Sequence, residues 1–297
     1  MSEPEVVARL ENASKRYGNV LALDRVDLAV RRGEVLAVLG PNGAGKTTAI
    51  SLLLGLLRAE TGSATLFGAD PTGLAPRQRI GAMLQTAGVP ETLAVGELVE
   101  LFRSYYPQPR TVADIVGLAG VGDLLKRRYG KLSGGQQRRA QFALALAGNP
   151  EILFLDEPTT GLDLEARETM WSTIRALVGE GRAVVLTTHY LEEAEALADR
   201  VGVLARGRIV AEGSVQQIRA RVAQRRIRCV SRLAAEAIAR WPEVRSAARD
   251  GERIEIVTDA AETVVRQLLF EDAELSELEV RRAGLAEAFV EITKEAA

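Results

Sequence analysis

The 297 residues are 47% hydrophobic and 26% charged, the composition of an ordinary folded protein, which excludes wholesale disorder and collagen-like repeats. The 38 basic and 40 acidic residues leave a formal net charge of −2, so there is no global basic field for wrapping nucleic acid. The single Cys229 and the single His189 exclude an intrachain disulfide and a zinc site built from cysteine and histidine. At about 150 residues per domain, the length predicts two domains, in a reducing, cytosolic setting.

No segment of the sequence has the pattern of a membrane or secretory signal. The N-terminal residues scatter charges where a signal peptide needs an apolar core, so we expect no secretory leader. The apolar runs Val35–Leu39, Ile152–Leu155 and Ala183–Leu186 are far shorter than the ~20 residues that span a bilayer. We therefore expect a cytoplasmic protein without membrane-spanning helices.

Along the chain, the hydrophobic period changes twice. Short β-branched runs and turns come first, and a helix is predicted from Lys46 toward Leu57. Helical spacing follows from about Gln85 to Asn149, and strands then return on either side of a helix predicted over Leu164–Val178. The sequence thus predicts an α/β cassette of residues 1–216 with a mostly parallel sheet, made of a core (1–85 and 150–216) and a helical subdomain (86–149).

A second domain is predicted over residues 217–297. Residues 219 to 232 hold six arginines and no acid, which suggests either contact with anionic lipid headgroups or pairing with acids of the cassette. Without a nucleotide or metal motif, we expect an accessory α+β domain whose first six elements follow the ferredoxin-like order. The predicted elements are the strand Ile227–Ser231, the helix Leu233–Arg240, the strands Val244–Arg249 and Arg253–Thr258, the helix Ala260–Phe270, the strand Leu275–Arg281 and the helix Leu285–Lys294.

The segment GPNGAGKTT, residues 40–48, follows the strand Val35–Leu39 and matches the phosphate-binding loop of P-loop nucleotide hydrolases. Its glycines let consecutive N–H groups point toward phosphates, and the next helix adds its positive N-terminal end. We predict that Lys46 reaches the β and γ phosphates and that the Thr47 hydroxyl binds Mg²⁺. A chance glycine-rich turn is a poor alternative in this context. The predicted nucleotide-binding residues are Gly40, Asn42, Gly43, Ala44, Gly45, Lys46, Thr47 and Thr48.

Two acids, Asp156 and Glu157, end the apolar strand in the sequence ILFLDEP. Asp156 is expected to hold Mg²⁺ through water, and Glu157 to act as the general base for the water that attacks the γ-phosphorus. Alone, these acids could equally be solvated turn residues. The phosphate-binding loop earlier in the chain favours the catalytic interpretation.

Between these motifs lies LSGGQQRR, where Ser133 is predicted at a helix N-cap and two glycines expose backbone N–H groups. With the phosphate-binding loop and LDEP in this order, the chain resembles the ATP-binding subunit of an ATP-binding cassette transporter over about residues 4–216. The resemblance implies that Ser133, Gly134, Gly135 and Gln136 close on the ATP held by a second copy, in an ATP-dependent head-to-tail dimer.

The resemblance also implies roles for four isolated residues. Tyr17 would stack on adenine, and Gln85 would touch the metal or the attacking water. Asp163 would line the subunit interface, and His189 would contact the γ-phosphate as a neutral donor. Without the resemblance, Tyr17 reads equally as a core or surface residue, Gln85 is uninformative, and Asp163 reads as a helix N-cap.

Two features follow the Gln85 loop. Ala94 stands where related exporters have the threonine of a capping box, so we expect a looser helix start there. Apolar and aromatic residues are dense between Leu98 and Tyr106, which suggests either a groove for a membrane subunit or the core of the helical subdomain.

Together these features predict a Mg²⁺-dependent ATPase that powers a separate transmembrane permease from the inner face of the cell membrane. The segment after Gln85 and the ending LAEAFVEITKEA resemble cassettes that export drugs, glycolipids or polysaccharides. The alternatives are a soluble cassette ATPase acting on nucleic acid or ribosomes, and a regulatory cassette without turnover. The single cassette and near-neutral charge argue against nucleic acid as a partner, and intact Glu157 and His189 argue against a loss of turnover.

Overall fold

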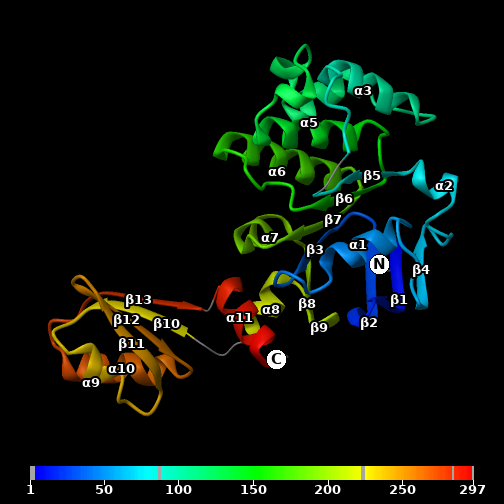
Figure 1. Ribbon diagram of the computed structural model, residues 1–297. Coiled ribbons are helices and arrows are strands. Elements are labelled where there is room, and N and C mark those ends of the chain that lie inside the picture. The colour runs from blue at the N-terminus through cyan, green and yellow to red at the C-terminus, as the bar shows by residue number, and fades with distance from the viewer. Residues whose placement is uncertain (1–3, 86–87, 222–224, 283, 296–297) are drawn as a thin grey trace. The chain divides into compact units, whose positions relative to one another are not determined.

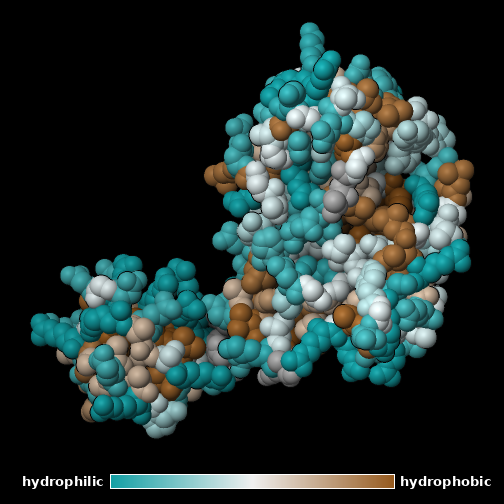
Figure 2. Space-filling model, in the orientation of Figure 1, coloured by the Kyte–Doolittle hydropathy of each residue, from teal (hydrophilic) through white to brown (hydrophobic). Residues whose placement is uncertain are grey.

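The computed structural model describes residues 4–85, 88–221, 225–282 and 284–295. The chain divides into two compact units, the first ending at Val215 and the second spanning Gln216–Glu295 (Figure 1). On the face drawn in Figure 2, hydrophilic residues cover most of the surface of each unit. Each unit has its own buried apolar cluster, so each is described by itself.

The first unit is built on a six-stranded sheet with the order β5-β6-β7-β3-β8-β9. Its neighbouring strands are parallel except for the β8–β9 hairpin, and β3, β6 and β7 are buried along their whole length. Burial on both faces explains their nearly continuous apolar sequences. This confirms the predicted α/β fold with a mostly parallel sheet. The strands are β3 (Val35–Leu39), β5 (Ile80–Met83), β6 (Ile152–Asp156), β7 (Ala183–Thr188), β8 (Arg200–Ala205) and β9 (Arg208–Gly213).

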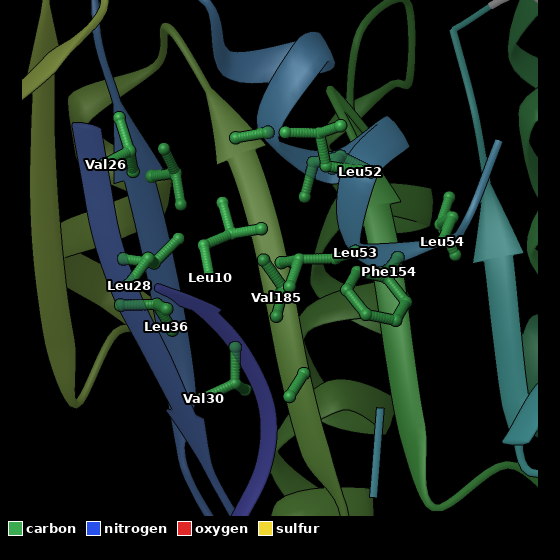
Figure 3. Close-up of a cluster of buried hydrophobic side chains, with 14 of the residues drawn as sticks. Leu10, Val26, Leu28, Val30, Leu36, Leu52, Leu53, Leu54, Phe154 and Val185 are labelled. Atoms are coloured by element: carbon green, nitrogen blue, oxygen red, sulfur yellow. The ribbon is translucent and has the colours of Figure 1, made fainter. Parts of the chain in front are cut away.

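A three-stranded antiparallel sheet, in the order β2-β1-β4, forms a second layer of this unit. Leu10 and Leu28 of this layer belong to one buried cluster with Phe154 and Val185 of the parallel sheet (Figure 3). Leu52 and Leu53 of the helix α1 complete that cluster, so α1 is held from both layers. The elements are β1 (Val6–Tyr17), β2 (Val20–Arg31), β4 (Thr61–Leu66) and α1 (Lys46–Leu53).

Helix α1 is shorter than predicted: it ends at Leu53 and does not continue toward Leu57. Gly55 has a φ of 65°, a left-handed conformation that ends helices. The N–H of Leu56 then donates to the carbonyl of Ser51 at 2.9 Å, which closes the last turn.

Helices fill the chain between β5 and β6 and flank the parallel sheet. Two short 3-10 turns, Gly122–Leu124 and Tyr129–Lys131, join the helices of the insertion. This mostly helical content agrees with the spacing of apolar residues in the sequence. The helices of the unit are α2 (Leu74–Arg77), α3 (Val95–Ser104), α4 (Val112–Ala119), α5 (Gly134–Leu146), α6 (Leu164–Gly179) and α7 (Leu191–Leu197).

No side chain caps the N-terminus of α3, as the residue Ala94 predicts. The donors of its first turn nevertheless find acceptors: Glu97 accepts from the N–H of Ala94 at 2.7 Å. The next two N–H groups donate to the carbonyls of Arg127 and Leu125, at 3.0 and 2.9 Å. The expectation of a loose helix start is therefore wrong, because main-chain groups from another segment replace the missing hydroxyl.

The second unit contains a four-stranded antiparallel sheet with the order β11-β12-β10-β13. One helix connects β10 to β11 and another connects β12 to β13, which is the ferredoxin-like arrangement. Ile227, Ile254, Val264 and Leu268 lie in its buried cluster. The elements are α8 (Val215–Ala220), β10 (Arg225–Val230), α9 (Ala235–Ile238), β11 (Val244–Asp250), β12 (Arg253–Thr258), α10 (Ala261–Glu271), β13 (Ser276–Arg282) and α11 (Leu285–Glu295).

Three of the six clustered arginines pair with acids of their own unit. Arg226 contacts Glu255 at 2.8 Å, Arg228 contacts the same carboxylate at 2.7 Å, and Arg232 pairs with Glu274. Pairing of these three with acids of the cassette, one of the two expectations from the sequence, is thus wrong. The strand β12 supplies the carboxylate for Arg226 and Arg228, and the segment before β13 supplies the one for Arg232. Pairing within the unit also weakens the case for lipid headgroups.

Glu151, just before β6, joins two arginines of the first unit. Its carboxylate accepts from Arg79 at 2.6 and 3.0 Å and from Arg32 at 2.9 Å. Hydrogen bonds from Arg79, and then from Arg32, lower the pKa of Glu151 to about 2. This trio joins the start of β6 to the residues next to β5 and β2.

We expect Glu151→Gln to reduce the loss of stability in acid. A carboxylate whose pKa is lowered on folding stabilises the protein above its ordinary pKa, here 4.5, and this contribution disappears as the pH falls toward about 2. Because the side chain is 27% exposed, solvent screening limits the effect to about 1–2 kcal/mol. Urea unfolding across this pH window measures it. The exposed Glu168→Gln is the control, and equal pH dependence in the two variants would contradict the prediction.

Candidate functional site

The predicted site residues follow four neighbouring strands of the parallel sheet, in the order β5-β6-β7-β3. Gln85 comes after β5, Asp156 and Glu157 lie at the end of β6, His189 follows β7, and residues 40–48 follow β3. Because the carboxyl ends of parallel strands lie at one edge of the sheet, the fold gathers these four segments there.

At several positions of the phosphate-binding loop, the backbone conformation or the surrounding space suits only glycine. Gly43 and Gly45 have φ values of 79° and 108°, in the left-handed region. A Cβ on Gly45 would also lie 2.5 Å from the carbonyl oxygen of Ala22, and one on Gly40 would collide with the carbonyl of Leu204. The loop therefore turns tightly against β2 and β8 and leads into the N-terminus of α1, where anions are favoured.

Lys46 is only 7% exposed and is held by its own loop. Its Nζ donates to the carbonyl oxygens of Gly40 at 2.7 Å and Pro41 at 3.1 Å. Burial lowers the pKa of Lys46, while the charges of Glu157 and Asp156 oppose that shift. The arrangement keeps an ammonium group at the phosphate-binding loop, as the sequence predicts.

Asp156 is buried and holds two hydroxyl groups. Thr47 donates to its Oδ2 at 3.2 Å, and Thr187 donates to its Oδ1. A carboxylate beside a threonine hydroxyl is the hard-oxygen donor set that Mg²⁺ uses together with phosphate oxygens. Within the described residues, no group of three or more His, Cys, Asp and Glu side chains is placed to hold a metal ion.

Sequence reasoning missed Thr187. In the paired strands β6 and β7, this residue lies directly opposite Asp156. The signal was a polar residue near the end of the apolar strand VVLTT, but only the register of the two strands shows that its hydroxyl meets Asp156.

Glu157 brings the predicted catalytic residues together. Its Oε1 lies 3.1 Å from Nδ1 of His189, and its Oε2 accepts from Nε2 of Gln85 at 3.5 Å, the outer limit of a hydrogen bond. Its backbone has a φ of 51°, a conformation that costs a residue with a side chain of order 1–3 kcal/mol. The carboxylate is 13% exposed, whereas His189 is 43% exposed. Glu157 thus combines a strained backbone with a carboxylate shielded from solvent, and this carboxylate faces a solvent-exposed histidine.

The LSGGQ segment begins α5 with a capping box. Ser133 Oγ accepts from the N–H of Gln136 at 3.4 Å, and Gln136 Oε1 accepts from the N–H of Ser133 at 3.1 Å. These residues line a cavity of about 670 Å³ together with Gln85 and residues 160–163. Among the described residues lining this cavity there is none from the phosphate-binding loop. LSGGQ therefore lines this cavity without the phosphate-binding loop of the same chain.

Asp163 and Tyr17 make no hydrogen bond or ion pair with Glu157 in the described part of the chain, and each has a local structural place. Asp163 caps α6, since its Oδ1 accepts from the N–H of Ala166 at 2.8 Å, and it lines the same cavity. Tyr17 ends β1 beside a turn in which Gly18 has a φ of 56°, and it is 49% exposed. An interface role for Asp163 and adenine stacking by Tyr17 stay predictions.

Comparison with known proteins adds to this geometry. A family described as "ABC transporter" matches residues 23–160. The chain is 41% identical to the daunorubicin resistance ATP-binding protein DrrA3 of Streptomyces coeruleorubidus, over 96% of this chain and 95% of that protein. It is 40% identical to the Nod factor export ATP-binding protein I of Burkholderia orbicola (strain AU 1054), over 68% of this chain and 69% of that protein.

Solved structures show the same likeness. The ATP-binding subunit of an ABC transporter covers 72% of this chain, with a TM-score of 0.67, 25% identity and 92% of that structure covered. A dimeric bacterial ABC transporter cassette covers 70% of this chain, with a TM-score of 0.65, 27% identity and 98% of that structure covered. The same kind of cassette has been solved as a dimer in a post-hydrolysis state with ADP and phosphate.

Proposed function

Because this chain belongs to the ATP-binding cassette (ABC) transporter family, we propose that it is the subunit that hydrolyses ATP to drive a membrane exporter. The observation that carries this proposal is the convergence of Glu157, His189 and Gln85 at the sheet edge that also bears the phosphate-binding loop. The relatives named for daunorubicin resistance and for Nod factor export support the outward direction.

In the proposed reaction, the loop N–H groups and Lys46 bind the β and γ phosphates of ATP. Thr47, Asp156 and Gln85 would hold Mg²⁺, and when bound the metal neutralises charge on the phosphate oxygens. Thr187 keeps the Asp156 carboxylate in place for that task. These residues supply positioning and electrostatic stabilisation, which are the main needs of phosphoryl transfer.

Glu157 is the proposed general base. It takes a proton from a water whose oxygen bonds to the γ-phosphorus, while the bond from that phosphorus to the β–γ bridging oxygen breaks, giving ADP and phosphate. His189, which touches the Glu157 carboxylate, would donate a hydrogen bond to the γ-phosphate. Gln85 reaches the other carboxylate oxygen and would orient the water.

We further propose that two copies form an ATP-dependent head-to-tail dimer. The described lining of the cavity at LSGGQ includes no residue of the phosphate-binding loop, which supports a nucleotide site completed by a second copy. An isologous pair gives each ATP the phosphate-binding loop of one copy and Ser133–Gln136 of the other. Asp163, beside the same cavity, would then lie at the interface.

Gly135→Ala is expected to weaken this dimer by about 1–3 kcal/mol. A Cβ on Gly135 would lie 2.7 Å from the carbonyl oxygen of Gly161, so the segment before Asp163 must shift. Light scattering with Mg·ATP in a Glu157→Gln background, where ATP is not consumed, measures dimer formation. Gly134→Ala is the matched control for the fold, because its Cβ meets open space and the melting temperature of the free chain should not change. An unchanged dimer in Gly135→Ala would contradict the proposed interface.

The membrane subunit is proposed to dock beside the Gln85 loop. Leu98 and Val99 are fully buried and belong to the core of the helical subdomain, whereas Tyr105 is 61% and Leu74 is 72% exposed. Hydrophobic surface is visible in Figure 2 on the side where α2 lies in Figure 1. No helix among the described residues is long and apolar enough to span a membrane. We propose a peripheral protein on the inner face of the membrane.

Tyr105→Glu should abolish co-purification with the membrane subunit, while ATP turnover of the free chain stays within about twofold, since an exposed substitution changes stability by about 0.5 kcal/mol or less. Phe270→Glu, at an aromatic residue 90% exposed on α10, is the matched control and should leave co-purification intact. Retained co-purification of Tyr105→Glu would move the docking surface elsewhere.

The second unit is proposed as an accessory domain, residues 217–297, that performs no chemistry. Its own buried cluster and its internal ion pairs support a separately packed unit. With a net charge of −2 for the chain, we propose no nucleic-acid partner.

A further inference from the structure

Behind the Glu157–His189 pair, two neighbouring strands lead into two helices. The strand β6 continues through residues 157–163 into α6, and β7 continues through His189 and Tyr190 into α7. The strands β6 and β7 are paired in register, and α6 contacts α7. The two segments that carry the catalytic pair are therefore supported by one packed layer of strands and helices.

Glu193, in the first turn of α7, is a buried carboxylate of this packed layer, and the proposed reaction does not use it. It is 1% exposed, and its Oε1 accepts from the indole Nε1 of Trp171 on α6 at 3.4 Å. Burial raises the pKa of Glu193, and the side chains of Thr188, Trp171 and Thr159, with the charge of Arg167, oppose that shift. The groups that face Glu193 therefore come from the end of β7, from α6 and from the segment after β6.

Two polar atoms around this carboxylate lack hydrogen-bond partners. Among the described residues, Glu193 Oε2 and Arg167 Nε are buried without a hydrogen-bond partner. Arg167 instead lies over the ring of Trp171, 5.1 Å from its centroid. Buried polar groups are nearly always hydrogen-bonded, so this pair is costly to stability and calls for another reason to be kept.

We propose that Glu193 is a positioning residue for ATP hydrolysis, which couples α6, through Trp171, to the turn that carries His189. A displacement of residues 157–163, which hold Glu157 and the interface residue Asp163, would then move His189 through one shared buried carboxylate. The inference rests on the proposed function, because it assigns Glu193 a role in the same reaction.

Glu193→Ala is the main test. We expect kcat for ATP to fall about 10- to 100-fold, as small displacements of catalytic groups do, with KM changed less than about threefold. Glu193→Gln keeps the shape and an acceptor for Trp171, so it should retain more turnover than Glu193→Ala. Glu192→Gln, at the exposed carboxylate next to it, is the matched control and should behave as the wild-type chain.

Trp171 provides a readout that a merely structural role would not change. The chain has two tryptophans, so in a Trp241→Phe background Trp171 is the one source of tryptophan fluorescence. Mg·ATP should alter this emission, and Glu193→Ala should lose the response while radiolabelled ATP still binds. If the alanine variant does not fold, Trp171→Phe removes the same link from α6 and should lower kcat at least about threefold with ATP affinity unchanged.

Turnover of Glu193→Ala equal to that of Glu192→Gln, with only the melting temperature lowered, would show a structural role and overturn the inference. Equal losses of kcat and ATP affinity would overturn it as well, as would normal turnover in Trp171→Phe. Absence of ATP hydrolysis in both the wild-type chain and Glu192→Gln would instead overturn the proposed function, and with it this inference.

Discussion

Glu157→Gln is expected to lower ATP turnover at least about 100-fold while ATP still binds, because the amide keeps the shape of the side chain and removes the general base. The amide oxygen still reaches His189, 3.1 Å away in the native chain, so the site should keep its geometry. Phosphate release measures turnover, and equilibrium dialysis with radiolabelled ATP measures binding.

The exposed Glu165→Gln, in the first turn of α6, is the control for this prediction and should keep native turnover. Hydrolysis at the wild-type rate in Glu157→Gln would remove Glu157 as the base. A residual activity below that limit fits a transition state stabilised by the surrounding positive groups.

Gly45→Ala should destabilise the cassette by about 2–4 kcal/mol and abolish measurable ATP binding. Its φ of 108° costs a residue with a Cβ about 1–2 kcal/mol, and the new Cβ would lie 2.5 Å from the carbonyl of Ala22 and 2.8 Å from Cδ2 of Leu23. Relief requires a shift of the phosphate-binding loop, which misdirects its N–H groups. Urea unfolding and ATP binding are the two measurements.

Gly181→Ala separates the two causes. Gly181 has a φ of 82°, also in the left-handed region, but a Cβ there meets nothing within 4 Å. This variant should lose about 1–2 kcal/mol of stability and bind ATP normally. Equal stability losses in the two variants would show that the contact with β2 has no effect beyond the backbone conformation.

The sequence predicts those parts of the site that lie within single continuous segments. GPNGAGKTT, LSGGQ and LDEP are local patterns, and the parallel sheet explains why segments far apart in the chain meet. The hydroxyl of Thr187 on Asp156 and the burial of Glu193 against Trp171 depend on strand register and helix packing, which no local pattern reports. For the same reason, the arginine cluster does not reveal from the sequence that Glu255 pairs with Arg226 and Arg228.

Element ends were less predictable than element types. The apolar spacing continued to Leu57, but Gly55 ends α1 earlier, since the capacity of glycine for a left-handed conformation outweighs the apolar pattern. At α3 the sequence correctly showed a missing cap hydroxyl. It could not show that carbonyls some 30 residues later replace it.

That replacement joins two loops of the helical subdomain. Besides the bonds at the start of α3, the N–H of Tyr129 donates to Leu93 and that of Gly130 to Glu91, both at 2.9 Å. Backbone hydrogen bonds thus join the chain after the Gln85 loop to the stretch that leads into Ser133. A tilt of the Gln85 loop, the proposed docking site, would therefore reach LSGGQ through main-chain hydrogen bonds. Because these bonds join main-chain groups, exposed side chains along both stretches can change without breaking them, whereas a proline at a donor position removes an N–H group. Gly130 is the exception, since a Cβ there would lie 2.8 Å from Cβ of Glu91.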